Sequence, residues 1–130
     1  YACGSKEIIK ILQKIKIPWS VNSLAQDAAN AVIKNTSHIK KSNLIIKKEL
    51  KYLENAISIL KGFECISSST NFILIKTKHD STKLQTKLLK SKILIRDCKN
   101  FRGLDNHYIR IAVKSHKDNV KLVAALEKII

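Results

Sequence analysis

Arginine is rare in this sequence and is confined to one stretch. Arg96, Arg102 and Arg110 lie within 15 residues, whereas the other 22 basic residues are lysines. A guanidinium presents a rigid fork of donors that can bind a carboxylate or a phosphate through two parallel hydrogen bonds, but an ammonium is a mobile point charge. Arg96 and Arg110 sit in short apolar runs that are typical of β-strands. We therefore predict that these two side chains, held on stiff elements, form an anion-binding pair.

The direction of Arg110 follows from the alternation of its strand. Ile109 and Val113 begin and end a set of alternate apolar residues that belongs against a core, so Arg110 points the other way. An arginine at this position could also reach solvent or pair with Asp97 or Asp105, and such exposed arginines are common. The same alternative holds for Arg96, which is adjacent to Asp97.

The loop between the two strands contains Arg102 and Gly103 and has the irregular composition of a binding loop. We expect Arg102 to be a charge at the rim. Cys98 begins this loop between basic residues, which can lower the pKa of a thiol, although nothing marks it as a nucleophile. No Ser/His/Asp or Cys/His order suggests a catalytic group.

Metal and disulfide chemistry are not indicated. The four histidines are scattered without the spacing of metal ligands. Cys3, Cys65 and Cys98 are odd in number, which argues against a disulfide framework or a zinc site and fits the reducing cytoplasm. No run of 18 apolar residues is present, so no segment is predicted to span a membrane.

The formal net charge of +15 suggests nucleic acid as a binding partner, because a basic surface attracts a polyanion. The lysines are dispersed, however, with never more than two in a row, and aromatic residues make up only 5% of the chain. Base-stacking surfaces need more aromatic side chains than this. We therefore expect solvated charged faces, and this composition argues against nucleic acid as a partner.

Hydrophobic periodicity and capping residues predict nine elements. The predicted helices cover residues 5–16, 23–33 and 39–61, then a segment starting at Asp80-Ser81 and one starting at Ser115, with Val120, Val123, Leu126 and Ile130 on the buried side of the last. The predicted strands cover residues 63–68, 71–77, 93–97 and 108–113. This order indicates an α/β (α+β-like) small domain. It would hold a mainly antiparallel sheet of about four strands with helices on one face, preceded by two or three helices.

Several segments together resemble one enzyme family. They are Ile93-Leu94-Ile95-Arg96-Asp97-Cys98, Asn100-Phe101, Gly103-Leu104-Asp105 and Tyr108-Ile109-Arg110-Ile111-Ala112-Val113, with Trp19 to Gln26, Ser69 to Phe72 and Ser115 to Asn119. They resemble the C-terminal small domain of the fold type I enzymes that use pyridoxal 5′-phosphate. Within these, the sequence is most similar to threonine-phosphate decarboxylases and histidinol-phosphate aminotransferases. The loop from Asn100 to Asp105 favours the decarboxylases.

The resemblance implies a function and roles for two residues. Arg110 would bind the substrate's α-carboxylate, and Arg96 would lie at its phosphate end. The parent enzyme would be a lyase of cobalamin biosynthesis, L-threonine-O-3-phosphate decarboxylase, or alternatively the aminotransferase of histidine biosynthesis. Its cofactor would be pyridoxal 5′-phosphate, its substrate a phosphorylated amino acid, its assembly a homodimer and its location the cytoplasm.

One departure from the family accompanies the resemblance. The lysine that forms the Schiff base with the cofactor precedes a stretch that Tyr1 to Ser5 would follow, and no lysine here matches it. The resemblance thus implies a fragment with no catalytic or cofactor-binding residue of its own, inactive alone. Residues 1–36 would be the end of the large cofactor domain together with the interdomain helices, and residues 37–130 would form the small domain. Two other readings stay open, a basic RNA-binding α+β module and a regulatory domain that binds an organic phosphate.

Overall fold

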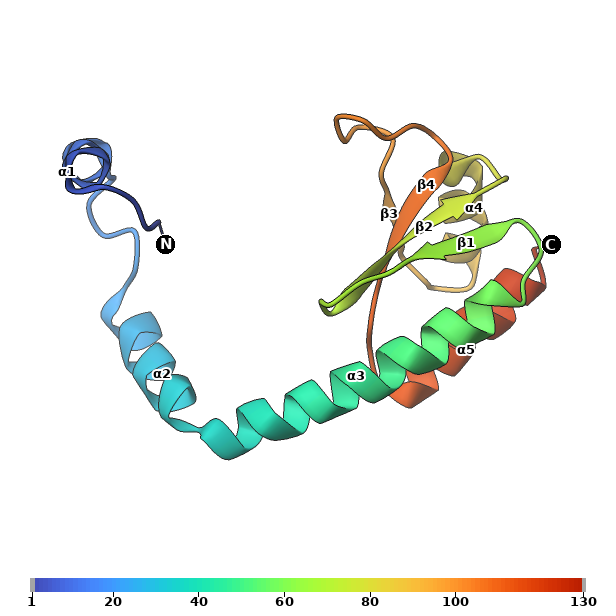
Figure 1. The fold of residues 1–130 in the computed structure, drawn as a ribbon, viewed down its shortest axis with the longest axis horizontal. Coiled ribbons are helices and arrows are strands. Elements are labelled where there is room, and N and C mark those ends of the chain that lie inside the picture. The colour runs from blue at the N-terminus through green and yellow to red at the C-terminus, as the bar shows by residue number, and fades with distance from the viewer. Residues whose placement is uncertain (1, 130) are drawn as a thin grey trace. The chain divides into compact units, whose positions relative to one another are not determined.

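The computed structural model describes residues 2–129 and contains the nine elements in the expected order (Figure 1). They are α1 (Lys6–Ile15), α2 (Ser23–Lys34), α3 (Thr36–Ser58), β1 (Phe63–Ile66), β2 (Phe72–Thr77), α4 (Ser81–Lys90), β3 (Arg96–Asp97), β4 (Tyr108–Ala112) and α5 (His116–Glu127). The chain divides into two compact units, residues 1–39 and 40–130. The predicted fold class is confirmed.

The first unit forms its helices through local signals. The Ser5 side chain caps α1 by accepting from Ile8 N at 3.4 Å, and Asn22 caps α2 by accepting from Ala25 N at 2.8 Å. Neither helix buries a residue. Side-chain oxygens at these positions satisfy backbone donors that have no partner within the helix, so capping accounts for where both helices begin.

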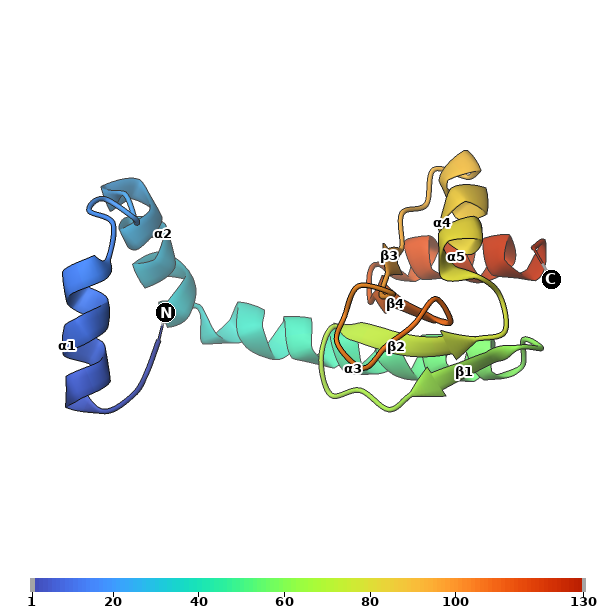
Figure 2. The same cartoon turned by 90° about the horizontal axis from the view of Figure 1, so that it is seen from above.

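The second unit is built on a four-stranded antiparallel sheet in the order β1-β2-β4-β3 (Figure 2). One face of the sheet packs against α3, α4 and α5. The core residues include Leu53, Ile57, Ile73, Ile75, Leu84, Leu88, Ile109, Ile111, Val123 and Leu126. Ile73, Ile75, Ile109 and Ile111 alternate with residues of the opposite face, which is the pattern of a sheet covered on one side.

Helices α3 and α5 lie side by side and are joined by polar side chains (Figure 1). Glu49 on α3 is only 4% exposed, and its Oε2 accepts from Asn119 Nδ2 at 2.9 Å. His116 Nδ1 lies 3.1 Å from the same oxygen. Asn119 also donates to Lys114 O and accepts from Lys114 N, so its amide is fully engaged.

The structure corrects the bounds of the long helix. Helix α3 begins at Thr36, three residues before the expected start, because the Asn35 side chain accepts from His38 N at 3.0 Å and caps the first turn. The helix ends at Ser58 rather than near residue 61. A turn follows and includes Gly62, whose φ of 86° lies in the left-handed region that glycine adopts without strain.

Two further expectations are wrong. The strand predicted over residues 93–97 is limited to Arg96–Asp97, because the preceding segment bonds to α4: Ile93 N donates to Leu88 O, and Gln85 Nε2 donates to Ile95 O at 2.7 Å. Val120, expected on the buried side of α5, is 42% exposed. Asn119 takes its place at the start of the buried face. Ile130, also expected there, lies outside the described residues.

Candidate anion-binding site

Arg96 and Arg110 occupy directly opposite positions on neighbouring strands. The register pairs Arg96 of β3 with Arg110 of β4. Opposite residues in an antiparallel pair project from the same face of the sheet, and the flanking Ile109 and Ile111 point into the core. The two guanidinium groups therefore extend from the face that α3, α4 and α5 leave open, as the sequence predicted for Arg110.

Neither arginine pairs with a carboxylate among residues 2–129, where the ion pairs are Lys99–Asp97 and His116–Glu49. Asp97 points toward α4, and Asp105 accepts from His107 N. The alternative in which Arg110 forms a salt bridge with one of these acids does not occur. The arginine pair therefore carries a positive charge that no carboxylate balances. Like charges at directly opposite positions of a sheet also destabilise it.

Aromatic and amide groups hold the two side chains instead. The Arg110 Cζ lies 4.7 Å from the centre of the Phe72 ring, and the Arg96 Cζ lies 5.3 Å from that of Phe101. Arg96 Nη2 also donates to Asn100 Oδ1 at 3.2 Å. These roles were not predicted from the sequence, because the diagonal placement of Phe72 depends on a strand register that spacing alone does not determine.

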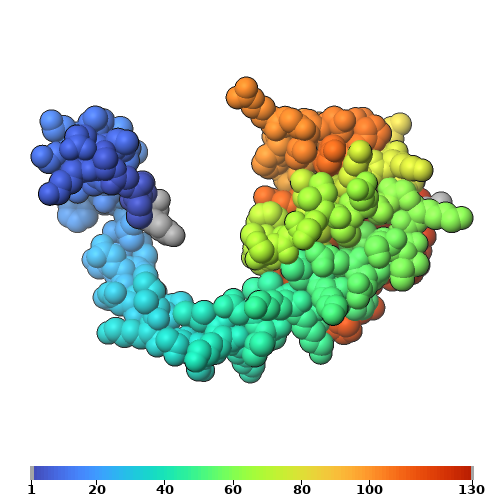
Figure 3. All heavy atoms as spheres, viewed as in Figure 1, coloured from blue at the N-terminus to red at the C-terminus, as the bar shows by residue number. Residues whose placement is uncertain are grey.

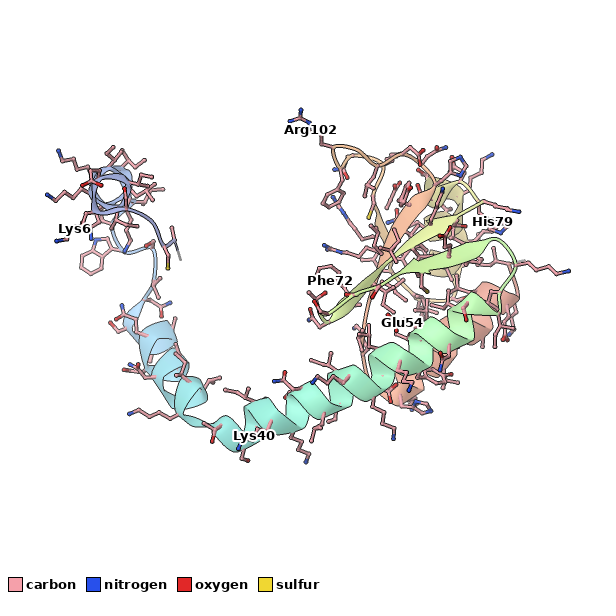
Figure 4. The ribbon with its side chains drawn as sticks, viewed as in Figure 1. Lys6, Lys40, Glu54, Phe72, His79 and Arg102 are labelled. Atoms are coloured by element: carbon pink, nitrogen blue, oxygen red, sulfur yellow. The ribbon has the colours of Figure 1, made fainter. Side chains whose placement is uncertain are left out.

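Arg102 does not join the other two arginines. It lies near the tip of the loop that follows β3, which stands out from the surface (Figure 3), and its side chain points away from the sheet (Figure 4). This agrees with its expected place at the rim.

Arg96 and Arg110 both line a cleft of about 470 Å³. Its other lining residues are Asn71, Phe72, Gln85, Leu94, Ile95 and Ala112. None of these is acidic, so the electrostatic potential of the cleft is positive. The cleft offers guanidinium donors, two amide side chains and an apolar floor, a combination suited to a small molecule with anionic groups.

Asp97 fixes β3 against the start of α4. Its Oδ1 accepts from Ser81 Oγ and its Oδ2 from Thr82 Oγ1, both at 2.8 Å, and Lys99 N donates to Oδ1 at 3.0 Å. Burial alone would raise the pKa of Asp97, but these hydrogen bonds outweigh it and lower that pKa below its ordinary value. An ionised acceptor thus anchors the short strand that carries Arg96.

The structure overturns the expectation for Cys98. The side chain is 1% exposed, and burial raises the pKa of its thiol although the nearby positive charges of Arg110 and Arg96 oppose the shift. Flanking charges in the sequence suggested the opposite direction, because they do not report that the residue turns into the core. A buried, protonated thiol is a poor nucleophile.

None of the described residues that line the cleft is a lysine. A covalent bond to pyridoxal phosphate requires a lysine amine, so these residues do not fit the anchoring site of that cofactor. Across residues 2–129, no group of three or more histidine, cysteine, aspartate or glutamate side chains is placed to hold a metal ion. No helix in the same range combines the length and the apolar character needed to cross a bilayer.

Comparison with known proteins gives one consistent result. The family model for class I and II aminotransferases matches residues 1–129. A histidinol-phosphate aminotransferase of Methanosphaera stadtmanae is 30% identical over 133 residues, which cover 100% of this chain and 36% of that protein.

Solved structures agree with the family match. The histidinol-phosphate aminotransferase of Clostridium acetobutylicum has a TM-score of 0.88 at 36% identity, over 95% of this chain and 38% of that one. The L-threonine-O-3-phosphate decarboxylase of Porphyromonas gingivalis has a TM-score of 0.80 at 30% identity, over 96% and 39%. The chain spans about a third of the length of its curated relatives. It belongs to the class I and II aminotransferase family.

Proposed function

We propose that this chain supplies the substrate-binding small domain of an enzyme that acts on a phosphorylated amino acid or amino alcohol. Arg110 binds the carboxylate, and Arg96 binds the phosphate. The enzymes of this family use pyridoxal 5′-phosphate, which supplies an electron-accepting ring. The residues of this chain would contribute the binding and orientation of the anionic groups.

The observation that carries the proposal is the opposition of Arg96 and Arg110 on the open face of the sheet. Two guanidinium groups in one cleft without a carboxylate repel each other, and a doubly anionic ligand would relieve this repulsion. Holding both ends of a substrate also restricts its orientation, which accelerates a reaction at the atoms between them.

The first choice of reaction is the decarboxylation of L-threonine-O-3-phosphate, and the second is the transamination of histidinol phosphate. Relatives of both kinds match the chain at similar identity. Residues 1–36 would complete a large cofactor domain and residues 37–130 would form the small domain. The division into compact units between residues 39 and 40 supports that boundary. A homodimer and a cytoplasmic location stay predictions.

The test of the binding role uses the full 130-residue chain and O-phospho-L-threonine. The three arginines give three side-chain Nε–Hε signals in a nitrogen-15 correlation spectrum. We expect saturable shifts of the Arg96 and Arg110 signals and none of the Arg102 signal, and weaker binding of inorganic phosphate or acetate. Equal shifts of all three arginines would mean screening of surface charge and would contradict the proposal.

A pair of ligands separates the two reactions. Phosphothreonine has two anionic groups, a carboxylate and a phosphate, whereas the phosphate is the single anionic group of histidinol phosphate. Replacing Arg110→Gln should lower the affinity for phosphothreonine roughly 10- to 100-fold, because a charge-assisted contact is lost, and should leave histidinol phosphate nearly unchanged. In the holoenzyme that contains this chain, the turnover of each compound is measured, and the compound that is turned over faster is the preferred substrate.

A further inference from the structure

We propose that Phe72 and Phe101 are positioning residues, each holding one guanidinium group of the anion-binding pair through its aromatic face. This inference rests on the proposed function and deepens it, because it states how two mutually repelling arginines are kept ready for a ligand. The two aromatic residues come from different segments and act on different arginines, so each can be tested separately.

Phe72 reaches Arg110 across the sheet. It is the first residue of β2 and lies opposite Ala112, two positions from Arg110 on β4. Such diagonal neighbours share a face and are within reach of aromatic and long side chains. The separation of 4.7 Å between the Arg110 Cζ and the ring centre is within the range of a cation–π contact. Arg110 therefore has a supporting surface on one side.

Phe101 reaches Arg96 from the loop. Phe101 N donates to Cys98 O, and Leu104 N donates to Phe101 O, both at 3.0 Å, so two backbone hydrogen bonds shape the turn that presents the ring. The Arg96 Cζ lies 5.3 Å from the ring centre. Both phenylalanines stay partly exposed, at 37% and 41%, although a ring of this size is normally buried. Their exposure is explained if their task lies at the surface.

A cation–π contact leaves the arginines able to bind. The attraction acts between the charge of the guanidinium and the face of the ring, so the N–H donors that do not point at the ring remain available for an oxyanion. Immobilising a free arginine side chain on binding costs conformational entropy. A side chain already held by a ring loses less. Preorganisation of this kind raises affinity without adding any contact to the ligand.

The choice of residue type agrees with this reading. The chain uses lysine for the other 22 basic positions, and an ammonium group cannot stack as a plane. Within residues 2–129, no aromatic ring lies in cation–π range of Arg102, which is on the same loop as Phe101 and serves as an internal reference.

The experiment compares Phe72→Leu and Phe101→Leu with Phe72→Tyr and Phe101→Tyr in the full chain. Leucine keeps the apolar bulk and removes the aromatic face, whereas tyrosine keeps the face. Protons above an aromatic ring resonate upfield, so the Hε signals of Arg96 and Arg110 should lie upfield of the Arg102 signal. Phe72→Leu should move only the Arg110 signal toward that of Arg102, and Phe101→Leu only the Arg96 signal.

Affinity for O-phospho-L-threonine is the second measurement. Each leucine variant should bind it about three- to tenfold more weakly, and each tyrosine variant should match the original. Val120→Ala, a change of an exposed side chain on α5, is the control and should alter neither signal nor affinity. In the holoenzyme the loss should appear in KM rather than in kcat.

The outcomes separate the two proposals. If Arg110→Gln weakens the binding of O-phospho-L-threonine 10-fold or more while the leucine variants keep both the arginine shifts and the affinity, the positioning role is wrong and the proposed function stands. If Arg110→Gln has no effect, the proposed function is wrong. If a leucine variant loses its folded amide spectrum, the unmodified chain still decides, because Hε signals of Arg96 and Arg110 that coincide with that of Arg102 overturn the positioning role.

Discussion

Asn119 of α5 donates a hydrogen bond to Glu49 of α3 at 2.9 Å, although 70 positions separate them in the sequence. Both side chains are buried, at 1% and 4% exposure. An ionised carboxylate in such a place is stable only with hydrogen-bond donors, and Asn119 and His116 occupy the same oxygen. The contact therefore fixes the position of α5 along α3 as well as the separation of the two helices.

Replacing Asn119→Ala should destabilise the fold by about 1–3 kcal/mol, because the Lys114 amide and carbonyl lose their partner inside the protein and Glu49 loses its shortest donor. Urea unfolding followed by circular dichroism measures the change. Asn55→Ala is the matched control, since Asn55 is exposed on α3, and should stay within about 0.5 kcal/mol of the original. Equal stabilities of the two variants would contradict a structural role for the contact.

Stability should also fall in acid through Glu49. The hydrogen bond from Asn119 lowers the pKa of Glu49 below its ordinary 4.5, despite burial, which raises it. The unfolded chain then takes up the proton at a higher pH than the folded chain. Glu49 contributes its full stabilisation above about pH 4.5 and loses it as the pH falls through the lowered folded pKa.

The variant Glu49→Gln keeps an acceptor for Asn119 but does not titrate. Its stability should therefore decline less between pH 5 and pH 2 than that of the original chain, measured as the urea midpoint at each pH. Glu127→Gln, an exposed position on α5, removes one negative charge and serves as the control. An acid limb in Glu49→Gln as steep as in the original chain would show that Glu49 is not the group that titrates.

Local patterns predicted most of the fold. The helix starts at Ser5, Asp80 and Ser115 and the alternation around Arg110 are properties of neighbouring residues, and all lie where the sequence analysis placed them. Val120 was misassigned because the buried face of α5 begins with a polar residue, Asn119. A pattern based on apolar residues cannot identify an amide whose partner is 70 positions away.

The site was predicted in part for the same reason. Strand alternation gave the face of Arg110, but the opposition of Arg96 and Arg110 depends on how the loop between them closes. The strand expected over five residues is only two residues long, because the residues before Arg96 form hydrogen bonds with α4 instead of with β4. Long-range packing also reversed the expected pKa shift of Cys98, since burial is not visible in the neighbouring sequence.

Two variants distinguish the hydrogen bonds that the Asp97 carboxylate accepts from the contacts that the exposed Lys99 side chain makes. Asp97→Asn replaces one acceptor oxygen by an amide donor, so Ser81, Thr82 and Lys99 N can no longer all be satisfied, and we expect a loss of about 1–3 kcal/mol. Lys99→Ala removes the ion pair of 3.6 Å and the hydrogen bond from Lys99 Nζ to Thr82 Oγ1 at 2.8 Å. Both contacts are made by a side chain that is 53% exposed, so stability should change by less than about 1 kcal/mol. Urea unfolding of both variants tests this, and a larger effect of Lys99→Ala would contradict it.

The three cysteines should react with iodoacetamide at widely different rates at pH 8. Cys3 is exposed, and burial followed by the charge of Glu54 raises the pKa of Cys65 to about 11. Cys98 is both buried and raised in pKa. Only the thiolate form reacts, and the buried Cys98 becomes accessible to the reagent only when the chain around it opens locally. Peptide mass spectrometry should therefore find Cys3 modified first and Cys98 last, by at least about 100-fold relative to Cys3, and all three alike in denaturant. Fast modification of Cys98 in the folded chain would mean that the segment after β3 opens readily, and a strand of two residues could not then keep Arg96 opposite Arg110.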